Sequence, residues 1–272
     1  MTLLLAALTL VYARGWYRLR KVLPKLLSIW RCAAFAGGIV SLWAAIGSPL
    51  AQLDEQLLTA HMAQHLLLMI VAAPLILLAA PSVILLHGLP RRFVRDVLGP
   101  IMRWRALHRL ANFCIQPAFC WLAAAVTVIG WHVPALFDLA LRSHVWHEFE
   151  HSSFFAAGLL FWWPVIKPGP TAGGPPRCYV PLYLFLATLP CDILSAFLAF
   201  CDRVVYQPYL SARPLFNLSP LQDQGLAGAL MWVTVTFAYL VPAIVITVQI
   251  ISPSRRYAGP RPSEAWKKSL VH

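Results

Sequence analysis

The sequence predicts an all-α, polytopic membrane helix bundle with seven transmembrane helices. Of the 272 residues, 60% are hydrophobic and only 12% are charged, and the mean hydropathy is +0.68, which is too apolar for a soluble domain. The 22 prolines and 11 tryptophans fit the same class, because membrane helices tolerate proline and carry tryptophan at their ends. With no internal repeat and no long linker, we expect one transmembrane helical domain over residues 1–272.

Six stretches reach or approach the roughly 20 apolar residues that a helix needs to cross a bilayer. They are 32–50, 64–86, 113–131, 149–166, 179–201 and 225–251. A seventh candidate, 1–13, is short. Its positive charges follow the apolar run instead of preceding it, which favours an uncleaved helix over a signal peptide.

Positive charges concentrate on alternate loops between these expected spans. The basic loops contain Arg14, Arg18, Arg20, Lys21, Lys25 and Arg31, then Arg91, Arg92, Arg95, Arg103, Arg105 and Arg109, then Lys167 and Arg177. A short basic tail follows at 253–272. Because Lys and Arg collect on cytoplasmic loops, we expect the N-terminus outside and the C-terminus in the cytoplasm. The basic residues of the cytoplasmic loops then account for the net charge of +12, and we expect no nucleic-acid partner.

This topology gathers most histidines at the outer membrane face. They are His61, His65, His132, His144, His147 and His151. His61 and His65 lie four residues apart, and so do His147 and His151. The two members of each pair therefore share one helix face. Imidazole is the commonest protein ligand of transition metals, and converging helix ends would supply several such ligands.

The sequence therefore predicts a metal or haem site. Its expected ligands are His61, His65, His132, His147 and His151. The competing interpretation is that these are ordinary polar residues at the membrane–water interface and bind no metal. His144 is an auxiliary candidate, since it falls near the loop before the helix. We interpret His87, His108 and His272 as ordinary polar residues.

Other polar residues have two interpretations each. Glu150 either orients a neighbouring imidazole or is a solvated interfacial charge. Asp192, in the middle of the sixth expected span, either serves an ion or proton path or is a neutral carboxyl bonded to another helix. Asp223 and Gln224 open the last span, where Asp223 either caps the helix or contributes to the outer site.

Sulfur-containing residues add a weaker signal. Met62, Met69 and Met231 are soft donors suited to Cu(I), although apolar packing also explains each of them. By the expected topology only Cys201 of the six cysteines lies near the outer face, so we expect no disulfide. The sequence lacks GxSxG, P-loop, HExxH and dinucleotide-binding patterns, and we predict no enzymatic activity.

Several segments, in order along the chain, resemble one protein family. They are "HMAQHLLLMIVAAPLILLAAP", "GWHVPALFDLAL", "HEFEHSSFFAAGLLFWWPVI", "VYQPY" and "LSPLQDQGLAGALMW". These resemble the signature segments of the CtaG-type cytochrome c oxidase assembly family, which are bacterial seven-helix membrane proteins linked to building haem-copper oxidases. The resemblance extends from about residue 34 to about residue 240.

The resemblance implies an integral protein of the bacterial cytoplasmic (inner) membrane that helps to mature the oxidase copper centre. It would bind or deliver copper from the periplasmic side, and its partner would be a cytochrome c oxidase subunit or a periplasmic copper donor. Whether it is a chaperone or a scaffold, and whether it forms a homo-oligomer, stay open. Two alternatives are a membrane transporter of a metal ion or small solute and a redox protein with b-type haem.

Overall fold

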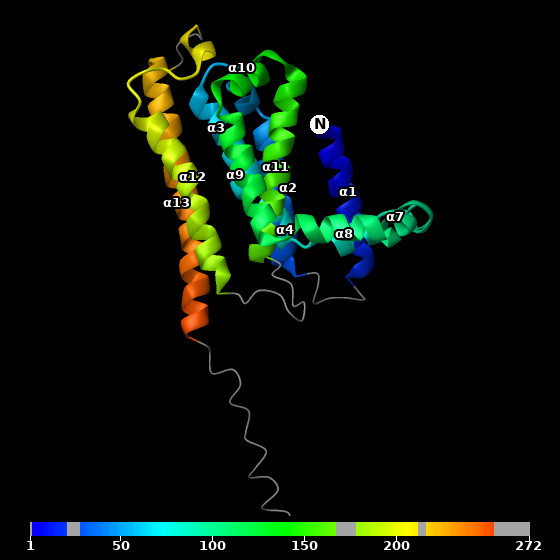
Figure 1. Cartoon of the computed structure of the whole chain (residues 1–272). Coiled ribbons are helices and arrows are strands. Elements are labelled where there is room, and N and C mark those ends of the chain that lie inside the picture. The colour runs from blue at the N-terminus through cyan, green and yellow to red at the C-terminus, as the bar shows by residue number, and fades with distance from the viewer. Residues whose placement is uncertain (1, 21–27, 167–177, 212–215, 253–272) are drawn as a thin grey trace, which may run out of the picture.

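The computed structural model describes residues 2–20, 28–166, 178–211 and 216–252. Every regular element in this part of the chain is a helix (Figure 1), so the predicted all-α class is confirmed. The predicted basic tail 253–272, with His272, lies outside the described residues. The same holds for Lys21, Lys25, Lys167 and Arg177.

The first helices form one side of the bundle. α1 (Thr2–Leu19) packs against α5 (Pro81–Gly88). α2 (Ile29–Ile46) is followed by the short 3₁₀ turn η2 (Pro49–Gln52) and packs against the helix that follows it.

That next helix is a continuous rod of three segments. They are α3 (Leu58–Leu66), the π-helical η3 (Leu67–Ala72) and α4 (Ala73–Leu78). The predicted span 64–86 therefore began too late and ran through a break. The break lies at Ala80, whose φ of 47° is left-handed, because the following Pro81 disfavours a right-handed helical conformation at the preceding residue.

An arginine-rich arm follows α5 and extends sideways from the bundle in Figure 1. It consists of α6 (Arg91–Phe93), η4 (Val94–Leu98), α7 (Gly99–Arg103) and α8 (Arg105–Cys114). On α8 the helical period places Arg105 and Arg109 on one face and Leu107 and Leu110 on the opposite face. α9 (Pro117–Trp131) turns away from α8 by 69°, so the predicted span 113–131 starts later, at Pro117.

The remaining helices complete the bundle. α10 (Pro134–Arg142) leads into α11 (His144–Ile166), which begins five residues before the predicted span 149–166. α12 (Tyr179–Phe200) agrees with the predicted 179–201 to within one residue. After η5 (Gln207–Leu210), α13 (Pro220–Ile251) starts earlier than the predicted 225. A capping box between Ser219 and Gln222 fixes that start.

Four helices in the described part are long and apolar enough to cross a membrane. They are Ile29–Gln52, Leu58–Leu78, Tyr179–Phe200 and Pro220–Ile251. The bent pair Arg105–Cys114 and Pro117–Trp131 makes a fifth if it counts as one span. α1 and α11 do not meet this criterion. The protein is thus an all-helical membrane protein.

A close approach between α11 and η3 sets the relative position of two helices that carry histidines. A Cβ added to Gly158 would lie 2.9 Å from the Met69 Cα, so only glycine allows the two backbones to come this near. The indole N–H of Trp162 donates to the Met69 carbonyl at 3.0 Å. Pro74 has no N–H to donate to the preceding turn. The Trp162 indole instead donates to the Met69 carbonyl, within the π-helical segment η3.

Candidate metal centre

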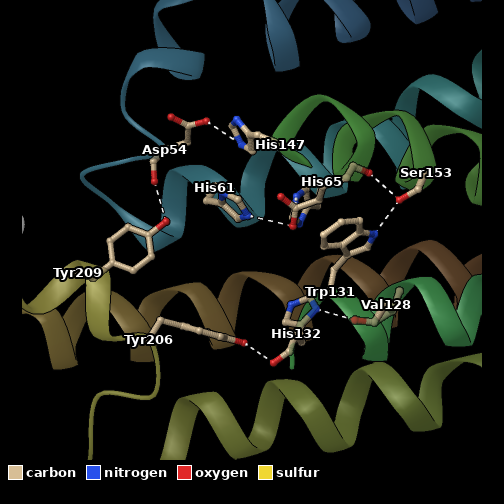
Figure 2. Close-up of polar contacts among 11 residues, drawn as sticks. Asp54, His61, His65, Val128, Trp131, His132, His147, Ser153, Tyr206 and Tyr209 are labelled. Atoms are coloured by element: carbon tan, nitrogen blue, oxygen red, sulfur yellow. Dashed lines mark hydrogen bonds and ion pairs between the residues drawn. The ribbon is translucent and has the colours of Figure 1, made fainter. Parts of the chain in front are cut away.

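The first group of site residues lies where α3 meets α11, at the end of the bundle opposite the arginine-rich arm. His61 and His65 are one turn apart on α3, and their rings meet edge to face with centroids 4.4 Å apart. Glu150 from α11 reaches between them, with its Oε1 3.5 Å from the His61 Nε2 and 3.4 Å from the His65 Nε2. His61 and Glu150 are fully buried. Figure 2 shows both imidazoles in this setting.

A second group lies beside the first. Asp54, in the segment before α3, places its Oδ2 3.3 Å from the His147 Nε2 on α11 (Figure 2). His151, one turn further along α11, has its ring centroid 4.3 Å from that of His147. Within Asp54, His147 and His151, one ligand atom of each lies within 4.8 Å of the others. The same relation holds within His61, His65 and Glu150.

Many polar atoms of these residues are buried without a hydrogen-bond partner. They are both ring nitrogens of His61 and His65, both carboxylate oxygens of Glu150, and Nε2 of His147 and His151. An unsatisfied buried polar group costs about 1–3 kcal/mol, and a buried charge costs more. Since imidazole nitrogen and carboxylate oxygen are metal ligands, a bound cation would satisfy several of these atoms at once.

His132 stands apart from both groups. Its Nδ1 lies 2.7 Å from the Val128 carbonyl, which makes that nitrogen the protonated one. Its Nε2 is buried and unpartnered, and the side chain lines a small cavity of about 30 Å³ together with His65. The predicted ligand His132 belongs to neither three-residue group.

Tyrosines from the chain between α12 and α13 hold the edges of the site. The Tyr209 hydroxyl donates to the Asp54 carbonyl at 2.6 Å, and the Tyr206 hydroxyl donates to the His132 carbonyl at 3.2 Å (Figure 2). Burial raises the pKa of the Tyr209 phenol well above its usual value, and the nearby Asp54 adds to this. Tyr209 therefore stays a neutral hydrogen-bond donor.

Aromatic and polar contacts fix the orientation of the ligands. Phe154 stacks on the His65 ring at 3.9 Å, and Phe137 packs 4.9 Å from the His61 ring. The Trp131 indole donates to the Ser153 hydroxyl at 2.8 Å, which in turn donates to the Glu150 carbonyl at 2.7 Å.

Asp223 lies near this region but has a different role from a ligand. Its carboxylate accepts from the backbone N–H groups of Leu58 and Thr59 and from the Thr59 hydroxyl. It thus caps the start of α3, a helix far away in sequence, while its own helix is capped by Ser219. Gln224 bonds the loop before η5 through Val205 and Arg203. Neither contributes to the histidine groups.

The other auxiliary candidates separate into two kinds. His144 is exposed and lies 4.0 Å from Glu148, away from the buried groups. Asp192 lies mid-way along α12 and is in neither group of potential ligands. Met62, in contrast, lines the small cavity with His65, and so do Met69, Met231 and Cys191. All six cysteines are free, in agreement with the expected absence of disulfides.

Sequence reasoning missed Asp54 and Tyr209. Nothing in the spacing of Asp54 connects it with His147, which lies more than ninety residues away in the sequence. Tyr209 was present in the quoted "VYQPY" segment, but without an assigned role. The one available signal for Asp54 is its position four residues before the histidine-bearing helix α3, and Glu55 and Gln56 share that signal.

Comparison with known proteins gives relatives of greater length. The chain is 26% identical, over 93% of its length, to Uncharacterized protein Mb0105 of Mycobacterium bovis and to Uncharacterized protein MT0111 of Mycobacterium tuberculosis. It is 24% identical, over 89% of its length, to Uncharacterized protein ML1998 of Mycobacterium leprae. The chain spans only 38% of the first two and 36% of the third. No solved structure matches the chain.

A family model provides the assignment. The model described as cytochrome c oxidase caa3 assembly factor matches residues 10–252, a range that includes the two histidine groups and all the described helices except the start of α1. The chain therefore belongs to the cytochrome c oxidase caa3 assembly factor (Caa3_CtaG) family.

Proposed function

We propose that this protein binds copper at the outer face of the bacterial cytoplasmic membrane and passes it to the copper centre of a cytochrome c oxidase during assembly. The ion exchanges between ligands, and no bond of a substrate is made or broken, so the protein is not an enzyme. The partners are an oxidase subunit that receives the ion and a periplasmic donor that supplies it. Membership of an oxidase assembly family supports this choice of metal and partner.

One observation carries the metal-binding part of the proposal. Three buried ligand groups, His61, His65 and Glu150, meet here. The Glu150 Oε1 lies 3.4–3.5 Å from the Nε2 atoms of the two histidines, and none of these atoms has a hydrogen bond. Imidazole and carboxylate ligands bind at about 2.1 Å, and two such ligands on a tetrahedral ion lie about 3.4 Å apart. The observed separations are thus too long for strong hydrogen bonds and suit two ligands on one ion.

The choice of copper over zinc depends on the family, because imidazole with carboxylate suits both metals. The surroundings favour Cu(I). Aromatic rings and aliphatic side chains surround the imidazoles, and the cavity beneath His65 presents thioether sulfur from Met62, Met69 and Met231. Soft sulfur donors favour Cu(I) over harder ions.

The proposal includes the seven-helix topology with the N-terminus outside. α1, α9 and α11 then join the four apolar helices, and α8, bent by 69° from α9, lies along the membrane surface. The arginines of the α6–α8 arm lie at the cytoplasmic surface, as the positive-inside rule requires, and the apolar face of α8 rests on the bilayer. The histidine groups, at the opposite end of the bundle, face the periplasm.

The test is metal analysis of protein purified in detergent without chelator, then loaded with Cu(I) under reducing conditions and desalted. We expect copper to remain bound to the wild type. The double variant His61→Ala/His65→Ala is expected to lose it. His87→Ala is the matched control, because His87 is exposed on α5 and its Nδ1 contacts only the Val83 carbonyl.

Equal copper in the wild type and the double variant would refute the proposal. A visible spectrum of the same samples separates the haem alternative, since b-type haem gives a Soret band and a copper site of this kind does not. A Soret band that disappears in the double variant would establish the redox alternative instead.

Transport is the second candidate function, and one observation favours it. The cavity below His65 is lined by Met69, Met231 and Cys191, so soft ligands continue inward from the histidines. Uptake of copper into proteoliposomes that contain the protein tests it. Uptake above empty liposomes, lost in Met69→Leu and Met231→Leu, would establish transport; copper bound without uptake supports the assembly role.

A further inference from the structure

The two three-residue groups share no member. His61, His65 and Glu150 form an inner group, and Asp54, His147 and His151 form an outer group. Each group offers three ligand atoms within 4.8 Å of one another, and each contains one carboxylate that offsets part of a cation's charge. One Cu(I) ion does not use all six residues, because this ion takes at most about four ligands.

The groups differ in their access to solvent. The His147 side chain is 21% exposed, whereas those of His61 and Glu150 are 0% exposed. Asp54 belongs to the segment that precedes α3 and not to a membrane-spanning helix. The outer group therefore has the more exposed ligand, His147, while its Asp54 side chain is 3% exposed.

The groups are close enough for direct passage of an ion. The His61 and His147 rings are nearly parallel, with centroids 5.6 Å apart. The His65 and His151 rings are also 5.6 Å apart. An ion that leaves the outer group thus meets inner imidazoles within one ligand exchange, without crossing an apolar barrier.

From these relations we infer that the protein holds two metal ions at once, one in each group, and that the outer site of Asp54, His147 and His151 loads the inner site. This inference rests on the proposed copper function and names the order in which its residues act. Ions pass by exchange of imidazole and carboxylate ligands with no change of oxidation state. His147 is the ligand that an incoming ion meets first, and Asp54 holds the ion with it.

Stoichiometry tests the inference. Wild-type protein titrated with Cu(I) under reducing conditions and measured by elemental analysis is expected to bind two ions per chain. Asp54→Asn, which keeps the side-chain volume, is expected to retain one, and so is Glu150→Gln. Glu55→Gln is the matched control, because Glu55 neighbours Asp54 in sequence and is in neither group.

Two outcomes have different meanings. No bound copper in the wild type would defeat the proposed function itself. One ion per chain in the wild type, unchanged in Asp54→Asn, would leave the function standing and overturn the two-site inference.

Electron paramagnetic resonance gives a second readout that does not depend on the variants. Two Cu(II) ions a few ångströms apart couple magnetically, so wild type fully loaded with Cu(II) in place of Cu(I) is expected to show a half-field signal. The half-loaded wild type is expected to show mononuclear copper with nitrogen hyperfine structure. A fully loaded sample with only isolated Cu(II) spectra would also overturn the inference.

Discussion

The carboxylate of Asp223 on α13 accepts a hydrogen bond from the backbone N–H of Leu58 on α3 at 2.6 Å, across 165 residues of sequence. A helix start has free N–H groups, and here another helix supplies the acceptor. The helix that carries His61 and His65 is thereby held in register with α13. The position of the inner ligands depends on this contact.

The first prediction concerns that contact. Asp223→Ala leaves the N–H groups of Leu58 and Thr59 without their acceptor, which is expected to cost about 0.5–2 kcal/mol and to weaken copper binding. Thermal unfolding in detergent and copper titration measure the two effects. Asp202→Ala, on the loop after α12, serves as the control. Unchanged unfolding in Asp223→Ala would show that α3 does not need this cap.

The second prediction concerns the tyrosine that supports Asp54. Tyr209→Phe removes the hydroxyl that donates to the Asp54 carbonyl at 2.6 Å, with a cost of about 1 kcal/mol. Copper affinity of the outer group is expected to fall several-fold, while the inner ion stays. Tyr206→Phe, which loses a bond to His132 instead, is the matched comparison. Titration of both variants checks the difference, and identical curves would contradict it.

The third prediction concerns the contact between α11 and η3. Gly158→Ala places a methyl group 2.9 Å from the Met69 Cα and 3.0 Å from the Ala73 Cβ, and such overpacking costs about 1–3 kcal/mol. The unfolding temperature is expected to fall. Gly130→Ala is the control, since a Cβ there meets nothing within 4 Å. A larger loss in Gly130→Ala than in Gly158→Ala would refute the close approach.

The fourth prediction concerns membrane orientation. Cys178 and Cys201 lie at opposite ends of α12; Cys178 is exposed and Cys201 is half-buried. In variants that keep one of these cysteines, a membrane-impermeant maleimide added to intact spheroplasts is expected to label Cys201 and to spare Cys178. Permeabilised membranes provide the control for reactivity. Labelling of Cys178 alone in intact spheroplasts would show that the protein has the opposite orientation in the membrane.

Local sequence patterns predicted much of the fold. Apolar runs of membrane length marked the positions of α2, α9, α12 and α13, because hydrophobic length is set by the bilayer and not by neighbouring helices. The ends of the helices were less accurate. The predicted apolar span began at residue 149 because residues 144–148 include polar side chains, although α11 itself begins at His144. Ala80 was missed as a break because a single left-handed residue leaves little trace in an apolar run.

The sequence by itself determined that the chain is helical and apolar, and that two histidine pairs each share a helix face, because both properties follow from the helical period and local composition. Only the tertiary structure decided which partners those histidines meet. It placed Glu150 between His61 and His65, set Asp54 beside His147, and moved Asp223 to the start of α3. Such contacts depend on how helices approach one another, which is fixed by packing at residues such as Gly158 and leaves no periodic mark in the sequence.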